Sequence, residues 1–194
     1  MNRREAIQKT SAILGFTASS PILISILNGC VPEKTIDWQP SFFSQDQAIL
    51  VGDIAETILP RTNTPGALDV GVDAFIDHVV YSCYEKSAQN YFIKGLEAID
   101  QESNLLDGDI FVNMSTEKKT QLLTNIENKA VHSNIDVEPK SQPFWLQMKS
   151  LTLLGYFTSE QIMKKHLEYV PIPTRLEGCI PLKDNQKLIV GNHI

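Results

Sequence analysis

The chain has 194 residues, of which 42% are hydrophobic and 21% are charged. This composition is typical of a single globular domain and argues against a disordered chain. The formal net charge is −6. Because phosphate backbones are bound by clustered Lys and Arg, this acidic balance argues against nucleic acid as a partner.

Residues 1–29 have the pattern of an export signal. Arg3 and Arg4 stand near the start, and an apolar stretch from Ala12 to Leu27 follows without a charged residue. A basic start before a short apolar segment is typical of secretory signals. The arginine pair resembles a twin-arginine signal, which carries folded proteins across a membrane. A Sec-type signal whose basic region contains two arginines is the alternative.

The apolar stretch ends at Cys30, where the sequence LNGC resembles a bacterial lipobox. The sequence therefore predicts an exported, periplasmic lipoprotein whose lipidated Cys30 attaches it to the membrane. A retained membrane anchor and a cleaved signal with an incidental cysteine are the alternatives. The anchor is disfavoured because the stretch contains Pro21 and is shorter than the roughly 20 residues of a membrane span. After export, Cys83 and Cys179 are candidates for a disulfide, with each other or with a partner chain.

The chain divides into this signal, a linker over residues 30–42 and a helical domain over residues 43–194. The linker contains two prolines, many polar residues and no apolar periodicity. These features predict that regular secondary structure begins only after it.

The domain opens with the sequence SQDQ at Ser44, which matches a capping box at the start of a helix. Apolar residues spaced three and four apart continue this helix until Pro60 ends it. Residues 61–71 combine glycine, proline and small polar residues, so they predict a structured loop.

Residues 72–83 and 91–99 also carry apolar side chains at helical spacing. A break near Ser87 leaves two interpretations open, two helices or one bent helix. Residues 105–109 predict a turn, and Ser115 predicts the N-cap of the next helix, with a carboxylate in its first turn.

After a polar loop over residues 132–143, residues 144–154 are apolar at most positions. This density predicts a central helix that is buried on most sides. Gly155 is predicted to end it. A second capping box at Thr158 then predicts a further helix to about Tyr169.

The C-terminal residues are predicted to be irregular or short extended structure, because Pro171 and Pro173 exclude helix. The sequence thus predicts an all-α fold: a single compact helical domain with long structured loops and an irregular C-terminal segment.

The sequence contains no Gly-rich nucleotide-binding loop, no covalent haem motif and no nucleophile elbow. The best candidates for metal ligands are Asp73, Asp77 and His78, with Glu56 nearby in sequence, because residues four apart share one helix face. The alternative is a solvated helix face, which we favour. We therefore predict no catalytic, cofactor-binding or metal-binding residue in this chain.

Aromatic residues occur as adjacent pairs, including Phe144–Trp145 and Tyr156–Phe157. Core packing or a ligand pocket would explain some of them. Adjacent residues cannot all face inward from one side of a helix, so part of these pairs is a candidate for cover by a partner chain.

Two long blocks resemble the gluconate 2-dehydrogenase subunit 3 family. The first is AETILPRTNTPGA over Ala55–Ala67, followed by Gly71–Val72 and Phe75–Asp77; the second is LTLLGYFTSE over Leu151–Glu160, followed by Leu167–Pro173 and Gly178–Cys179. The similarity spans roughly residues 43–181. Residues 87–143 match only in their helical character.

The resemblance implies a non-catalytic accessory subunit that pairs with a large FAD-dependent dehydrogenase of the glucose–methanol–choline type. That partner oxidises a sugar or polyol, and a cytochrome c subunit carrying haem c accepts the electrons in many such complexes. FAD and haem are thus expected on partner subunits and not on this chain. The accessory subunit assists export, folding and membrane attachment of the flavoprotein.

The segments 60–71 and 169–181 are the predicted partner contacts, because proline and glycine stiffen and shape their backbones. The predicted contact residues are Pro60, Arg61, Pro65, Gly66, Tyr156, Tyr169, Pro171 and Pro173. Cys179 is the candidate for an interchain disulfide. Two competing hypotheses stay open: a free-standing lipoprotein that binds a small ligand in its helical bundle, and an enzyme in its own right.

Overall fold

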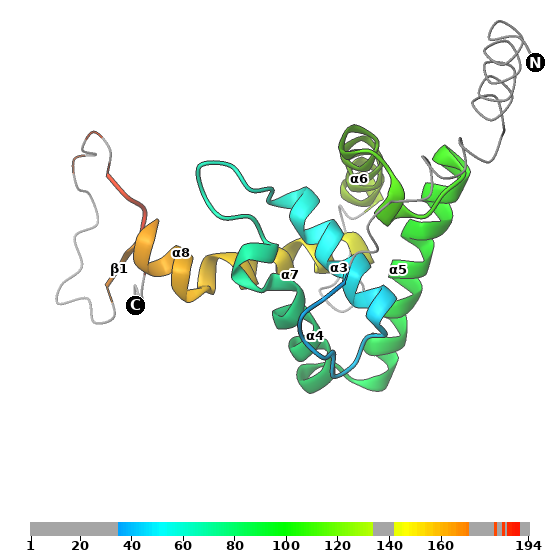
Figure 1. Ribbon diagram of the computed structural model, residues 1–194, viewed down its shortest axis with the longest axis horizontal. Helices are drawn as coiled ribbons and strands as arrows, with labels where there is room; N and C mark the ends of the chain where they lie inside the picture. Colours follow the sequence, from blue (N-terminus) through cyan, green and yellow to red (C-terminus); the bar gives the residue numbers. More distant parts are fainter. Residues whose placement is uncertain (1–34, 134–141, 171–180, 182–183, 185, 191–194) are drawn as a thin grey trace, which may run out of the picture. The chain divides into compact units, whose positions relative to one another are not determined.

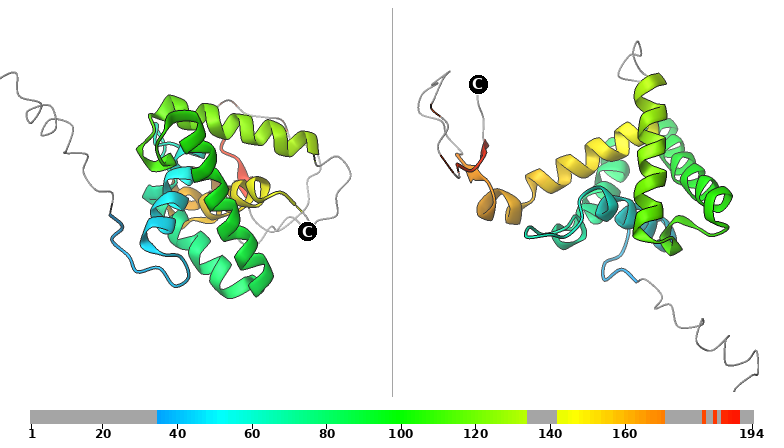
Figure 2. Two further views of the ribbon diagram at one scale, coloured as in Figure 1. Left: turned by 90° about the vertical axis from the view of Figure 1, so that its right-hand side faces the viewer. Right: turned by 90° about the horizontal axis from the view of Figure 1, so that it is seen from above.

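The computed structural model of the chain describes residues 35–133, 142–170, 181, 184 and 186–190. The chain forms two units, residues 1–35 and residues 36–194. The second unit contains all the described residues except Thr35 and is the coloured ribbon of Figures 1 and 2. Its described part consists mainly of α-helices, with two short strands, which confirms the predicted all-α fold.

The described elements are, in chain order, α3 (Gln45–Ile58), the 3-10 turn η1 (Leu68–Val70), α4 (Val72–Cys83), α5 (Lys86–Asp107), the 3-10 turn η2 (Phe111–Asn113), α6 (Thr116–Ser133), α7 (Phe144–Thr158), α8 (Glu160–Lys165), β1 (Glu168–Tyr169) and β2 (Ile189–Val190).

Helix α3 begins with the predicted capping box. The backbone N–H of Gln47 donates to Oγ of Ser44 at 3.2 Å, and the backbone N–H of Ser44 donates to Oε1 of Gln47 at 3.0 Å. The helix ends at Ile58, two residues before Pro60, as predicted. Ile54 is fully buried, and α3 packs against α4, α5, α6 and α7. Helix α3 therefore lies at the centre of the core.

Helices α4 and α5 are separate, which settles the choice between two helices and one bent helix. The break lies at Tyr84 and Glu85, slightly before the predicted position. Gln89 stabilises the corner, because its buried side-chain amide donates to the backbone carbonyl of Val80 at 2.9 Å and of Tyr81 at 3.3 Å. These bonds satisfy carbonyls that the end of α4 would otherwise leave without a donor.

The predicted turn at residues 105–109 is wrong at its start, because α5 continues to Asp107. Gly108 then ends the helix in the left-handed region, with φ of 76°, and donates its N–H to the carbonyl of Asn104 at 2.8 Å. Ser115 lies before the first residue of α6 and its Oγ accepts from the N–H of Lys118 at 3.5 Å, in agreement with the predicted N-cap.

Helix α7 does not end at Gly155, as predicted, but continues to Thr158. Gly155 therefore lies inside the helix. Glycine is needed at this position because a Cβ would lie 2.6 Å from the ring of Phe75 in α4. The second capping box is also wrong. Ser159 caps α8 without a side-chain bond to its N–H groups, and its hydroxyl donates to the carbonyl of Tyr156 at 2.7 Å.

Helix α8 ends at Lys165, earlier than predicted, and Tyr169 lies in strand β1. Strands β1 and β2 pair in parallel, with Glu168 opposite Ile189 and Tyr169 opposite Val190. The described C-terminal residues thus agree with the prediction of short extended structure. None of the described helices combines the length and apolar character needed to cross a membrane.

Candidate functional site

The loop 60–71 joins α3 to α4, and hydrogen bonds to Glu56 of α3 fix its conformation. The Glu56 carboxylate accepts the backbone N–H of Arg61 at 3.0 Å and that of Leu68 at 2.9 Å. It also lies directly over Gly66, where a Cβ would be 2.2 Å from Oε1. Gly66 is therefore required for this close approach.

A second carboxylate closes the loop 60–71 on itself. Asp69 accepts the Nε–H of Arg61 at 2.6 Å and the backbone N–H of Gly66 at 2.8 Å, and it also forms an ion pair with the Arg61 guanidinium. The backbone N–H of Ala67 donates to the carbonyl of Leu59 at 2.9 Å. The loop thus has many fixed contacts although most of it is neither helix nor strand.

Tyr156 connects the loop 60–71 to α7. Its hydroxyl donates to the backbone carbonyl of Pro65 at 2.8 Å, and its side chain is buried. Tyr156 and Gly66 are therefore buried residues that fix the conformation of the loop 60–71. Any role of these two residues in partner binding is indirect, through the conformation of this loop.

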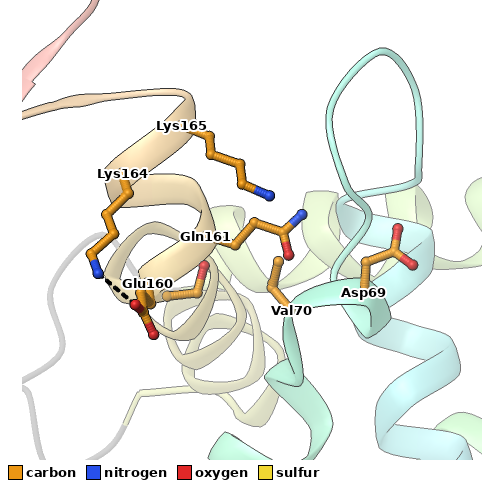
Figure 3. A pocket seen from close by; sticks show the side chains of 7 residues that line it. Asp69, Val70, Glu160, Gln161, Lys164 and Lys165 are labelled. Carbon is orange, nitrogen blue, oxygen red and sulfur yellow. Dashed lines mark hydrogen bonds and ion pairs between the residues drawn. The ribbon is translucent and has the colours of Figure 1, made fainter.

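A polar cleft of about 440 Å³ lies between the loop 60–71 and α8 (Figure 3). Figure 3 shows Gln161 and Lys165 pointing from α8 toward the loop. Lys164 instead pairs with Glu160 at 2.5 Å, and this hydrogen bond and positive charge lower the pKa of Glu160. The cleft is lined by both carboxylate and ammonium side chains, together with the amide of Gln161, which suits a polar group of a bound partner.

Of the other predicted contact residues, Pro60 and Arg61 are exposed, Pro65 is half-buried, and Tyr169 is exposed in β1. Pro171 and Pro173 lie outside the described residues, as do Arg3, Arg4, Cys30 and Cys179. Cys83 is exposed at the end of α4. The partner contacts, the export signal, the lipidation and the disulfide all stay predictions.

The predicted solvated face of α4 is wrong, because Asp73 and Asp77 are buried. Asp77 is only 1% exposed and accepts the backbone N–H groups of Ser41 at 2.7 Å, Phe42 at 3.1 Å and Phe43 at 2.9 Å. The segment 36–43 is thereby attached to α4 although it contains no helix or strand.

Asp73 makes a second contact with the segment 36–43, since it accepts the indole N–H of Trp38 at 2.8 Å. His78 is exposed, and Glu56 serves the loop 60–71. Across the described ranges, no three His, Cys, Asp or Glu side chains are placed to hold a metal ion together.

Sequence reasoning considered Glu56 only as a metal ligand and gave no role to Asp69. A carboxylate in the last turn of a helix that enters a Gly- and Pro-containing loop is the available signal, because the backbone N–H groups of such a loop need acceptors outside regular secondary structure. Buried Asp77 offers no local signal, since its partners lie 34 to 36 residues earlier in the chain.

Comparison with known protein families gives a match that covers most of the described helices. The family model described as gluconate 2-dehydrogenase subunit 3 matches residues 45–174, about two thirds of the chain. This range contains the loop 60–71, Tyr156 and the cleft beside α8. No significant match was found among curated proteins or among solved structures. By its extent, this match shows that the chain belongs to the gluconate 2-dehydrogenase subunit 3 family.

Proposed function

We propose that the chain is the non-catalytic accessory subunit of an exported FAD-dependent sugar or polyol dehydrogenase of the glucose–methanol–choline type. It assists export, folding and membrane attachment of the catalytic flavoprotein, and a cytochrome c subunit receives the electrons. The observation that carries this proposal is the family match over residues 45–174, because the family is a subunit of a dehydrogenase.

The internal contacts of the acidic residues support an accessory role. Glu56, Asp69, Asp73 and Asp77 each accept hydrogen bonds that hold irregular segments in place. Carboxylates that are occupied in this way stabilise the fold of the loop 60–71 and the segment 36–43. A preformed loop suits a surface that binds a partner chain, because little conformational entropy is lost on binding.

The test is purification of the affinity-tagged full-length chain from the membranes of its source cells, followed by a visible absorbance spectrum. The proposal predicts a yellow complex with flavin absorbance, a large subunit identified by mass spectrometry as an FAD-dependent dehydrogenase, and haem bands from the cytochrome. A colourless, monodisperse chain would contradict it. Dehydrogenase activity of the chain alone would also contradict it, in favour of the enzyme hypothesis.

One observation favours a second candidate function, the free-standing ligand-binding lipoprotein. A groove of about 440 Å³ between α5, α6 and α7 is lined mostly by apolar side chains. Trp145 lines this groove, and its buried indole N–H has no acceptor within the described part of the chain. Native mass spectrometry of the isolated chain tests this candidate. A bound species of defined mass supports it, and the bare chain alone contradicts it.

A further inference from the structure

The C-terminal half of helix α7 is apolar on most of its sides, but the described part of the chain covers only one side of it. The residues of the buried side of α7 are Phe144, Trp145, Met148, Leu151, Thr152, Gly155 and Tyr156. A helix that is apolar all round is normally buried all round. Leu154 and Phe157 are nevertheless 52% and 44% exposed. Within the described ranges, the C-terminal half of α7 therefore has an apolar side that no other segment packs against.

The exposed side of α7 lies opposite its packed side. Successive residues of an α-helix are rotated by about 100°, and Gly155 faces Phe75 of α4 while Tyr156 reaches Pro65 in the loop 60–71. Leu154 and Phe157 consequently point away from both contacts. Figures 1 and 2 show this half of α7 extending beyond α5 and α6 toward α8.

The exposed side of α7 also carries no charge. Residues 150–158 read SLTLLGYFT and contain no acidic or basic residue, in a chain with a net charge of −6. The hydroxyl of Thr158 donates back to the carbonyl of Leu154 at 2.6 Å, so it is satisfied within the helix. An occupant that fits this surface is apolar and uncharged, because a charge buried there would have no partner.

We propose that the outer face of α7, formed by Ser150, Leu153, Leu154, Phe157 and Thr158, docks onto an apolar, uncharged surface of the large dehydrogenase subunit. This inference rests on the proposed function. The family is one of dehydrogenase subunits, which supplies a partner chain, and the missing charge and missing cover specify its chemistry. The face is distinct from the loop 60–71, which lies on the other side of the helix.

The test compares capture of the flavoprotein by tagged full-length chains. The double variant Leu154→Glu, Phe157→Glu places two charges on the outer face, and Leu105→Glu, Leu106→Glu places two charges on exposed positions of α5 as the matched control. Because buried apolar anchors dominate interface affinity, we expect capture to weaken at least about tenfold in the first variant and to stay unchanged in the control.

The outcomes separate the inference from the proposed function. A wild-type chain that captures no flavoprotein overturns both. If the Leu154→Glu, Phe157→Glu variant captures the flavoprotein as well as the wild type does, the inference alone is overturned. A variant with normal capture but a lowered melting temperature shows that another segment of this chain covers the face. A wild-type dimer that the variant converts to monomer, with capture intact, shows that a second copy does.

Photocrosslinking keeps the inference testable even where the charged variant fails to fold. Leu154→p-benzoylphenylalanine is a nearly apolar change at an exposed position, so it preserves the character of the face. Irradiation of the complex is expected to join this chain to the large subunit. Crosslinks formed only within the chain, or only between two copies, overturn the inference.

Discussion

At the scale of single residues, Glu56, Asp69 and Asp77 have one task in common. Each accepts hydrogen bonds from backbone N–H groups in segments that lack regular secondary structure. Hydrogen bonds to a charged acceptor are stronger than those between neutral groups, at roughly 1.5–3 kcal/mol each. A few carboxylates therefore suffice to fix the loop 60–71 and the segment 36–43.

Asp77→Ala tests this task in the segment 36–43. The change leaves three backbone N–H groups without their acceptor, and one of them, that of Phe43, is buried. We expect the free energy of unfolding to fall by about 3 kcal/mol, measured by urea denaturation with far-UV circular dichroism. His78→Ala, at the exposed neighbouring position, is the control and should change it by less than about 0.5 kcal/mol. Equal losses in the two variants would refute this role of Asp77.

Asp100 provides a prediction about pH. Burial raises the pKa of Asp100, and the hydrogen bond from the Phe111 N–H lowers it by a smaller amount. The folded state therefore binds the proton more tightly than the unfolded state. The contribution of Asp100 to the free energy of unfolding is fully present below about pH 4, near its ordinary pKa, and is lost as pH rises through the folded pKa.

The variant Asp100→Asn keeps an acceptor for Phe111 and removes this titration. Its stability relative to the wild type should therefore increase as pH rises from about 4 toward neutrality. Urea denaturation at a series of pH values measures the difference. A difference that is constant with pH, or that decreases, would contradict the raised pKa.

At the scale of elements, local patterns predict helix starts better than helix ends. The capping box at Ser44 is correct because both of its hydrogen bonds form within four residues. Gly155 fails as a terminator because the reason for glycine lies outside the helix, in the ring of Phe75. The box at Thr158 fails because Thr158 is still the last residue of α7, and Ser159 is the N-cap residue of α8. At Gly155 a tertiary contact overrode the local signal.

Gly95→Ala tests a second close approach, between α5 and α7. Alanine favours helix over glycine by about 1 kcal/mol. A Cβ at position 95, however, would lie 2.1 Å from the ring of Phe144 at the start of α7. We expect a net loss of about 1–3 kcal/mol in the free energy of unfolding, because the buried ring must move.

Asn90→Ala, at an exposed position of the same helix, is the matched control and should not destabilise the protein. Combining Gly95→Ala with Phe144→Ala should cost at least about 1 kcal/mol less than the two changes added separately. Stabilisation by Gly95→Ala would show that α5 and α7 are not in close contact there.

At the scale of the whole molecule, the sequence predicted the fold class and the family, because both depend on patterns repeated over many residues. The candidate site was predicted only in outline. The composition of the loop 60–71 identified it as structured, but Glu56 and Asp69 as its supports were not foreseen. The burial of Asp77 depends on residues more than 30 positions away, and such pairing cannot be inferred from local spacing.

The proposed localisation makes a prediction about the complete chain. Cys30→Ser removes the lipid acceptor, so the protein should move from the membrane fraction to the soluble periplasmic fraction in immunoblots. Arg3→Lys with Arg4→Lys should instead retain the protein in the cytoplasm, if the twin-arginine pathway exports it. Unchanged membrane attachment of Cys30→Ser would refute lipidation at this residue.

On the proposed lipidation of Cys30, the attachment of the segment 36–43 to α4 would also limit the distance between the domain and a bilayer. Cys30 and Ile36 are six residues apart, and six residues span at most about 20 Å. On the proposed lipid attachment, the hydrogen bonds of Asp73 and Asp77 thus leave only a few residues between the lipidated cysteine and the folded domain. A flavoprotein bound to this subunit would then work close to the lipid surface, and lengthening the chain between Cys30 and Ile36 would move it outward.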